Sequence, residues 1–320
     1  MSEAESFLND VLQGLAASRP ALPCKYLYDQ RGSALFEAIC QTQDYYITRA
    51  DLALHDLYLD EISLLIGPDA HVIEFGSGAG IKTRKLLASL NQPRAYTPIE
   101  ISASALNESE TLLRRQFPDL EIRPLRADYT QAIDDEELLL EPPARRRVIY
   151  FPGSTISNFD HEEARHFLAR LLSVIGDQGG VLIGVDLLKP TERLVRAYDD
   201  SEGITAQFNL NLLERMVREL DARIELDAFA HEARFNEEQN RIEMHLLAQR
   251  DTTIEIGNHR FAFRQGESIH TENSHKYSID GFRSLAVSAG LTATQTWTDP
   301  EGLFSMHWLT VSKPGTNASP

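Results

Sequence analysis

The sequence predicts an α/β protein built on a parallel, doubly wound sheet, with a smaller α+β block inserted into it. Three observations support this fold class. Short apolar runs alternate with amphipathic helical segments from about residue 70 to 189, as in successive βαβ units. A glycine-rich loop joins the first apolar run to the first of these helices. Between about 190 and 276 apolar and polar residues alternate instead, which is typical of antiparallel strands with one solvated face.

Capping residues and hydrophobic periodicity predict the individual elements. The last helix of the first block begins at the N-cap Asp160 and ends at Gly176. Two helical segments, TERLVRAYDD and FNLNLLERMVREL, precede the strand-like runs of the inserted block. A helix ended by Gly290 and a hairpin of TATQTWTD and FSMHWLTVS close the fold. In the first block, strands are predicted at 71–76, 95–101, 122–129, 147–155 and 179–188, and helices at 82–90, 102–117 and 161–176.

Composition argues against several classes of protein. The 320 residues are 42% hydrophobic, and 31 basic against 48 acidic residues give a formal charge of −17. Because phosphate backbones and anionic lipids repel so acidic a chain, we expect no nucleic-acid partner. Cys24 and Cys40 lack CxxC spacing, so we expect neither a disulfide framework nor a metal site. The sequence has no signal peptide and no long apolar stretch, which predicts a cytoplasmic protein without membrane binding. We also expect a monomer.

The glycine loop EFGSGAGIKT indicates the kind of cofactor. Gly76, Gly78 and Gly80 follow a strand and precede a helix, where glycine lets the backbone turn and approach a ligand closely. A dinucleotide fingerprint would need a further glycine where Ile81 stands. The spacing E-x-G-x-G-x-G is instead usual in class I (Rossmann-like) methyltransferases. We therefore expect S-adenosylmethionine as cosubstrate.

Two acidic residues at later strand ends agree with this cofactor. Glu100 closes the second strand, where a carboxylate can accept hydrogen bonds from both ribose hydroxyls. Asp128 follows the third strand beside Tyr129, where a carboxylate can accept from the adenine amino group. Each acid alone could equally be a helix N-cap or a solvated loop residue. Their coincidence with the glycine loop favours a cofactor site.

Eight segments of the chain share a further signal: KYLYDQRGSALFEAI, DYYITRAD, EFGSGAGIKT, FPGSTISNF, RLVRAYDD, FNLNLLERMVREL, RIEMHL and TENSHKY. Together they resemble one known family, the histidine-specific Nα-methyltransferases of ergothioneine biosynthesis. The resemblance extends from about residue 20 to 312, nearly the whole chain. It implies transfer of three methyl groups from S-adenosylmethionine to L-histidine, giving Nα-trimethylhistidine (hercynine). It also implies a methyltransferase domain at 50–189 and 277–320 and a substrate-binding domain at 1–49 and 190–276.

The resemblance also implies roles for individual residues. Tyr28 would lie near the transferred methyl group and the substrate amine. Glu100 stands where the family often has Asp, and the carboxylate is kept. Glu272 and Ser274 would bind the imidazole, with Asn273 between them, and Met244 would line the side-chain site. The cofactor would contact Tyr28, Gly76, Gly78, Lys82, Glu100, Asp128 and Tyr129, and the amino-acid backbone would contact Tyr45, Asn158 and Tyr198.

The chemistry of an imidazole makes a Glu–Ser pair reasonable, because the ring presents a donor on one nitrogen and an acceptor or second donor on the other. Apart from the resemblance, Tyr45 and Tyr198 would be core tyrosines, Glu272 a surface acid and Met244 core packing. For catalysis the amine must lose a proton, and we expect Tyr28, Tyr198 or a bound water to relay it. The competing interpretations are a same-fold methyltransferase for another amino acid or amine, a nicotinamide-dependent oxidoreductase and a non-catalytic binding module.

Overall fold

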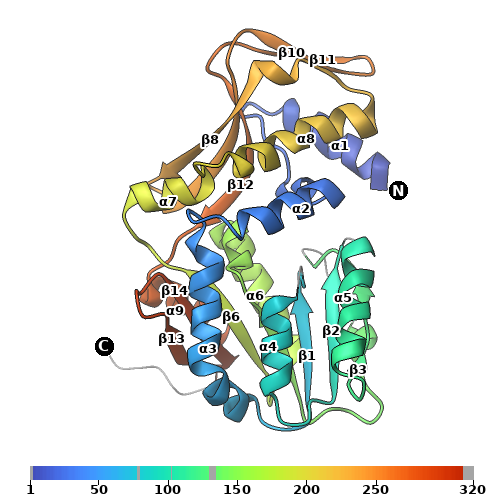
Figure 1. Cartoon of the computed structure of the whole chain (residues 1–320), viewed down its shortest axis with the longest axis vertical. Coiled ribbons are helices and arrows are strands. Elements are labelled where there is room, and N and C mark those ends of the chain that lie inside the picture. The colour runs from blue at the N-terminus through green and yellow to red at the C-terminus, as the bar shows by residue number, and fades with distance from the viewer. Residues whose placement is uncertain (1–2, 78–79, 102, 130–134, 313–320) are drawn as a thin grey trace. The chain divides into compact units, whose positions relative to one another are not determined.

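The computed structural model describes residues 3–77, 80–101, 103–129 and 135–312. The chain divides into two compact units, each discontinuous in sequence (Figure 1). The first unit comprises Met1–Tyr46 and Lys189–His275, and the second comprises Ile47–Leu188 and Lys276–Pro320. These boundaries lie close to those expected from the sequence. The roles expected for the two units, substrate binding and methyl transfer, remain predictions at this point.

The second unit contains an eight-stranded sheet that confirms the predicted α/β fold class (Figure 1). Its order is β13-β14-β6-β5-β1-β2-β3, with β4 also paired to β2. The strands from β6 to β3 and β4 pair in parallel, whereas β14 pairs antiparallel with both β6 and β13. The strands are β1 (Ala70–Phe75), β2 (Ala95–Glu100), β3 (Glu121–Ile122), β4 (Leu125–Arg126), β5 (Arg146–Phe151), β6 (Gly180–Asp186), β13 (Leu291–Thr298) and β14 (Phe304–Val311).

Helices cover this sheet and account for its apolar strand sequences. Every residue of β1 and β6 is buried, as expected for parallel strands with both faces covered. Helix α6 begins with a capping box between Asp160 and Glu163 and buries Phe167 and Leu171 in the main core. The helices of this unit are α3 (Tyr46–Ile66), α4 (Ile81–Ser89), α5 (Ala103–Gln116), α6 (His161–Ile175) and α9 (Ile279–Ser288), with short 3₁₀ turns η2 (Asp135–Leu138) and η3 (Thr155–Asn158).

Two predicted strands differ from the structure for the same physical reason. The segment expected as one strand at 122–129 forms the two short strands β3 and β4, which flank Pro124. The strand expected at 147–155 ends at Phe151, directly before Pro152. Proline has no N–H to donate to a sheet ladder, so it interrupts strand pairing. After Pro152 the chain turns into η3, which carries Asn158 at its end.

The first unit combines helices with two antiparallel three-stranded sheets, β12-β9-β8 and β11-β10-β7. The N-terminal segment joins the first sheet through a bridge between Ala21 and His270. The TENSH run forms most of β12, a strand that alternation in the sequence did not indicate. The elements are α1 (Glu3–Leu15), η1 (Cys24–Leu27), α2 (Gln30–Ile39), α7 (Thr191–Tyr198), α8 (Ile204–Leu220), β7 (Arg223–Ile224), η4 (Leu226–Ala228), β8 (Phe229–Asn236), β9 (Arg241–Ala248), β10 (Thr252–Ile256), β11 (His259–Phe263) and β12 (Ser268–His275).

Of the helices in the described part of the chain, none is both long and apolar enough to cross a bilayer.

Candidate active site

The carboxyl ends of three neighbouring parallel strands bring together four of the residues predicted to bind the cofactor. Gly76 follows β1, Glu100 ends β2, and Asp128 and Tyr129 follow β4. The strands are in register, because Phe75 pairs with Ile99 and Glu100 pairs with Arg126. Ligands of open parallel sheets bind at this edge. Gly78, also predicted, lies outside the described residues.

Gly76 shows why glycine is needed at the start of this loop. Its φ of +71° lies in the left-handed region, which residues other than glycine rarely adopt. Its N–H donates to the carbonyl of Ile99 at 2.8 Å, which ties the loop to β2. A Cβ at this position would come within 3.5 Å of Cε1 of the Tyr129 ring. The Tyr129 ring therefore lies in contact range of the Gly76 backbone, and the two residues meet at the edge of the sheet where a ligand is expected.

Glu74, the acid that opens the glycine motif, is buried and accepts hydrogen bonds from two neutral hydroxyl groups. Its Oε2 accepts hydrogen bonds from the Thr83 hydroxyl at 2.7 Å and the Tyr96 hydroxyl at 2.6 Å. Burial raises the pKa of Glu74 to about 7, against the lowering effect of these hydrogen bonds. The contacts tie β1, β2 and α4 together beneath the glycine loop. Glu74 is the first residue of the EFGSGAGIKT motif, but the sequence did not indicate a role for it in the site.

Lys82, predicted to bind the cofactor, is held by a carboxylate that the sequence analysis missed. Its Nζ donates to Oδ2 of the fully buried Asp51 at 2.8 Å, and the same oxygen accepts from the Gly153 N–H at 2.9 Å. Burial alone would raise the pKa of Asp51, but Lys82 and His55 outweigh it and hold the pKa well below its usual range. His55 in turn contacts the Tyr150 hydroxyl through Nε2 at 2.6 Å. A sequence signal existed: Asp51 and His55 stand four residues apart on α3.

The Gly153 backbone also explains the close approach of Lys82. The φ of Gly153 is +73°, and a Cβ there would lie 2.9 Å from Lys82 Nζ. Any larger side chain would displace the ammonium group. Asp51 on α3, Lys82 on α4 and the turn after β5 thus fix one positive charge within the second unit.

In the first unit the structure brings together five predicted residues, here called the tyrosine–glutamate cluster: Tyr28, Tyr45, Tyr198, Glu272 and Ser274. The Tyr28 hydroxyl donates to Glu272 Oε1 at 3.3 Å. The hydroxyls of Tyr198 and Ser274 are 2.6 Å apart and share a hydrogen bond. The Tyr45 and Tyr198 rings meet edge to face with centroids 6.0 Å apart. All except Tyr28 are buried, and Tyr28 is partly so.

A β-bulge decides which way Glu272 and Ser274 point. Before the bulge, His270 pairs with His245. The register then shifts, so that Glu272 pairs with Met244 and Ser274 with Ile242, both of which are buried. Because side chains alternate between faces, the shift moves Glu272 and Ser274 to the face of Met244. Unbroken alternation would have placed them on the face of His270.

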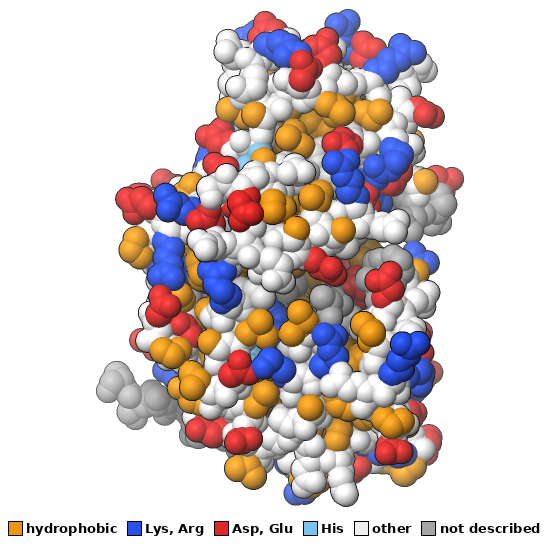
Figure 2. All heavy atoms as spheres, in the orientation of Figure 1, with side chains coloured by type: hydrophobic (Ala, Val, Ile, Leu, Met, Phe, Trp, Pro, Cys, Tyr) orange, Lys and Arg blue, Asp and Glu red, His pale blue; other side chains and the backbone are white. Residues whose placement is uncertain are grey.

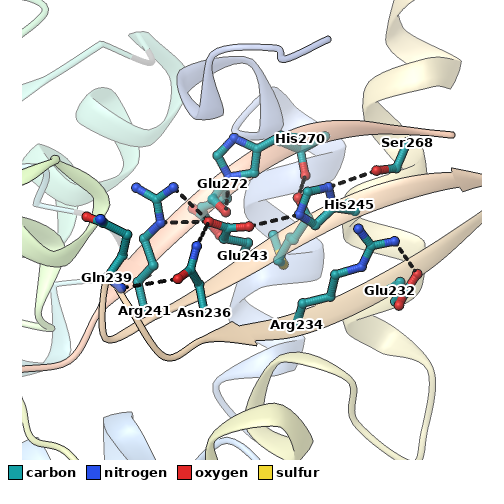
Figure 3. Close-up of polar contacts among 12 residues, drawn as sticks. Glu232, Arg234, Asn236, Gln239, Arg241, Glu243, His245, Ser268, His270 and Glu272 are labelled. Carbon is teal, nitrogen blue, oxygen red and sulfur yellow. Dashed lines mark hydrogen bonds and ion pairs between the residues drawn. The ribbon is translucent and has the colours of Figure 1, made fainter. Parts of the chain in front are cut away.

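The face of β12-β9-β8 opposite Met244 carries a polar network (Figure 3). Glu243 accepts hydrogen bonds from Arg241 and Asn236, at 2.8 and 2.9 Å, and contacts His245 Nε2 at 3.3 Å. These hydrogen bonds outweigh burial and lower the pKa of Glu243 to about 2. His245 also contacts Ser268 through Nδ1 at 3.1 Å. The network stabilises this sheet from the side that does not carry the cluster.

The remaining predicted residues, Met244, Asn273 and Asn158, do not belong to the tyrosine–glutamate cluster. Met244 is buried opposite Glu272 and packs in the core of its sheet. Asn273 pairs with Glu243, so its side chain belongs to the other face and the structure does not bring it together with Glu272 and Ser274. Asn158 ends η3 in the second unit. Within the described residues, no group of three or more His, Cys, Asp or Glu side chains could hold a metal ion.

Comparison with known proteins extends these observations. A family model described as histidine-specific, SAM-dependent methyltransferase matches residues 7–311. Two proteins named histidine N-alpha-methyltransferase are each 36% identical to the chain. One, from Mycolicibacterium smegmatis, aligns over 95% of both chains, and the other, from Mycobacterium tuberculosis, aligns over 93% of this chain and 92% of its own. Ergothioneine biosynthesis protein 1 of Neurospora crassa is 31% identical over 87% of this chain and 32% of its own length.

The family model covers nearly the whole chain, including both compact units. With the α/β sheet and the glycine loop already described, this match assigns the cofactor class as well as the fold. The chain belongs to the family of histidine-specific, S-adenosylmethionine-dependent methyltransferases.

Proposed function

We propose that this enzyme transfers three methyl groups from S-adenosylmethionine to the α-amine of L-histidine, giving Nα,Nα,Nα-trimethylhistidine (hercynine) for ergothioneine biosynthesis. The observation that carries the proposal is the inward placement of Glu272 and Ser274 beside Tyr28 and Tyr198. A carboxylate and a hydroxyl side by side match the two nitrogens of an imidazole. Membership of the histidine-specific family and the names of its relatives support the same substrate.

The second unit offers groups that fit S-adenosylmethionine. Gly76, which carries no side chain, and the Tyr129 ring beside it suit the adenosine part, with Glu100 for the ribose hydroxyls and Asp128 for the adenine amino group. The buried Ser77 hydroxyl, which has no hydrogen-bond partner among the described residues, is available to a ligand. The bound cosubstrate supplies the methyl group as a sulfonium. We propose that Lys82, Gly78 and Tyr28 also contact it.

Glu272 is well suited to select an imidazole. The hydrogen bond from Tyr28 orients its carboxylate, and burial removes competing water. Ser274 can donate to or accept from the second nitrogen while its oxygen stays bonded to Tyr198. A ligand with an apolar ring would bury Glu272 and Ser274 against it with no hydrogen bond from the ligand, so that only their protein partners Tyr28 and Tyr198 remain. Such a loss costs about 1–3 kcal/mol for each buried polar group left short of a partner. We propose that Tyr45, Asn158 and Tyr198 hold the amino-acid backbone and that Met244 lines the side-chain site, whereas Asn273, on the other face of the sheet, takes no part.

The reaction requires the amine to lose one proton before each transfer. The nitrogen lone pair forms the new C–N bond as the C–S bond breaks, and the sulfur keeps that electron pair. Positioning contributes most of the acceleration in such a displacement. We propose that Tyr28 and Tyr198 relay the released protons toward water. After the third transfer the nitrogen carries no hydrogen, so its hydrogen bonds to the tyrosines are lost and release is favoured.

We further propose that the enzyme acts as a cytoplasmic monomer, uses no metal and has no nucleic-acid partner. The formal charge of −17 supports the last point, because phosphate backbones repel an acidic surface. The alternative function is a same-fold N-methyltransferase for another amino acid or amine. The polar pair Glu272 and Ser274 disfavours it, since a phenyl ring offers neither group a hydrogen bond and an indole offers a single N–H, whereas an imidazole presents two nitrogens.

Product analysis tests the proposal directly. The purified enzyme is incubated with excess S-adenosylmethionine and either L-histidine, its Nα-monomethyl form or its Nα,Nα-dimethyl form, and mass spectrometry follows the products. All three should be converted to the trimethylated compound. As a matched control, L-tryptophan and L-phenylalanine should react at least about a hundredfold more slowly, because neither ring can form hydrogen bonds with both Glu272 and Ser274. Arrest at monomethylhistidine, or preference for an aromatic amino acid, would contradict the proposed function.

A further inference from the structure

A chain of buried hydrogen bonds connects two parts of the tyrosine–glutamate cluster, and it runs through Asn209 on α8. The Asn209 side chain is fully buried. Its Oδ1 accepts from the Thr271 hydroxyl at 2.7 Å, and its Nδ2 donates to the His245 carbonyl at 3.0 Å. The same Nδ2 lies 2.9 Å from His231 Nδ1, and His231 Nε2 lies 2.7 Å from the Tyr198 carbonyl. Each contact is within hydrogen-bonding distance.

The donors and acceptors along this chain have one consistent arrangement. The Asn209 amide can only donate from Nδ2, so His231 Nδ1 is the acceptor. The ring hydrogen of neutral His231 is then on Nε2, where it donates to the Tyr198 carbonyl. The single hydroxyl hydrogen of Thr271 takes the shorter of two contacts, 2.7 Å to Asn209 rather than 3.1 Å to the Met244 carbonyl. Asn209 therefore uses its oxygen and both of its amide hydrogens.

Thr271 is the extra residue of the bulge that turns Glu272 and Ser274 inward. A bulge leaves its extra residue outside the regular ladder, so other contacts must hold it. Thr271 makes its contact with Asn209 from the inner face. On the outer face, His270 Nε2 lies 3.1 Å from the Glu272 carbonyl, as the two labelled residues in Figure 3 show. The bulge is thus held from both sides directly beside the residue expected to bind the imidazole.

We propose that Asn209 is a positioning residue for substrate specificity. Through Thr271 it holds the bulge that directs Glu272 and Ser274 inward, and through His231 it holds the backbone of Tyr198. Asn209 itself makes none of the contacts expected of the substrate. It keeps the imidazole-binding pair and the amine-side tyrosine at a fixed spacing within the first unit. This inference rests on the proposed function.

Two substitutions of Thr271 test the inference, one that removes the hydroxyl group and one that keeps it. Thr271→Val removes the hydroxyl but keeps the shape, whereas Thr271→Ser keeps the hydroxyl. The matched control is Thr252→Val on β10, because Thr252 is buried in the same unit and its hydroxyl has no partner among the described residues. The measurements are kcat and KM for L-histidine and for L-thienylalanine, an analogue whose ring lacks both nitrogens, and the Kd of S-adenosylhomocysteine.

We expect Thr271→Val to lower the preference for histidine over thienylalanine about tenfold, mainly through KM for histidine, the effect of misplacing one buried hydrogen-bonding group. The Kd of S-adenosylhomocysteine should change less than about twofold. Thr271→Ser and Thr252→Val should both retain the wild-type preference. An unchanged preference in Thr271→Val, or an equal loss in Thr252→Val, would overturn the inference.

A second variant keeps the test decisive if Thr271→Val does not fold. His231→Phe leaves the bulge intact and cuts the branch to Tyr198, so a raised KM for histidine with an unchanged Kd for S-adenosylhomocysteine supports the inference, and unchanged constants contradict it. Wild-type activity on histidine is measured first. Its absence would contradict the proposed function and the inference with it. Normal wild-type activity with unaltered variants would contradict the positioning role alone.

Discussion

Two buried carboxylates of the second unit show how single residues acquire different charges from their surroundings. Glu74 has hydroxyl partners, and its burial raises its pKa to about 7. Asp51 is equally buried, but the Lys82 ammonium beside it and the nearby His55 hold its pKa well below the usual range. A neighbouring cation thus decides whether a buried acid stays ionised. The sequence presents both only as acids within apolar segments.

The raised pKa of Glu74 predicts a pH-dependent stability. The folded state prefers the protonated acid, so this contribution is fully present below the ordinary pKa of 4.5 and is lost as pH rises through about 7. Glu74→Gln imitates the protonated form and should show no such loss. Between pH 5 and 8 the wild type should lose stability relative to the variant by about 2–3 kcal/mol. Chemical denaturation at a series of pH values checks this, and a constant difference between the two proteins would contradict it.

At the scale of elements, a contact between α3 and α4 fixes the position of the Lys82 ammonium group, which neither helix could fix alone. Asp51 on α3 binds Lys82 on α4, and its second contact reaches the Gly153 N–H in the turn after β5. Three elements that are distant in sequence therefore fix one ammonium group. A sequence motif can indicate Lys82 but not the carboxylate that orients it.

The variant Asp51→Asn should weaken cofactor binding. It removes the charge that fixes Lys82 while keeping the side-chain shape, and we expect the Kd of S-adenosylhomocysteine to rise about tenfold, as the loss of one charge-assisted contact predicts. Asp56→Asn is the matched control, because Asp56 pairs with Lys85 between the same two helices but on the exposed surface. Such pairs contribute about 0–1 kcal/mol, so Asp56→Asn should bind normally. Isothermal titration calorimetry measures both, and equal affinities would rule out this role for Asp51.

The elements also show how far the sequence predicts this fold. The sequence predicted the position of β1, β2 and β6 because each is a continuous apolar run, and that of α4 and α6 because helical segments follow or separate these runs. It failed where Pro124 and Pro152 interrupt strands, and it did not indicate β12, whose bulge breaks the alternation. For the site, glycine and acid positions at strand ends could be predicted from local pattern. The contacts of Asp51, Asn209 and Thr271 could not, because their partners are distant in sequence.

At the scale of the whole molecule, the chain leaves the first unit after Tyr46 and returns to it at Lys189. Each unit holds its own set of predicted residues: cofactor groups at the edge of the parallel sheet, and the tyrosine–glutamate cluster beside the antiparallel one. Figure 2 shows that acidic and basic side chains are interspersed over the visible face. The formal charge of −17 is thus not gathered into one visible patch.

Ligand binding should stabilise the molecule in a way that identifies the cofactor. A ligand at about a hundred times its Kd adds about 2.7 kcal/mol to the folded state. We expect S-adenosylhomocysteine at such a concentration to raise Tm by several degrees in a thermal-shift measurement. NAD at the same concentration should leave Tm unchanged, because Ile81 replaces the last glycine of a dinucleotide loop. The reverse pattern would support a dinucleotide enzyme.

The sequence by itself determined the α/β class, the glycine loop with its acids at strand ends, and the family. These features depend on local periodicity and on short motifs, which a linear chain displays directly. Only the tertiary structure decided that Asp51 holds Lys82, that Glu74 is a buried acid with a raised pKa, and that a bulge at Thr271 turns Glu272 and Ser274 inward. These outcomes depend on burial and on contacts between distant segments, and both arise only when the chain has folded.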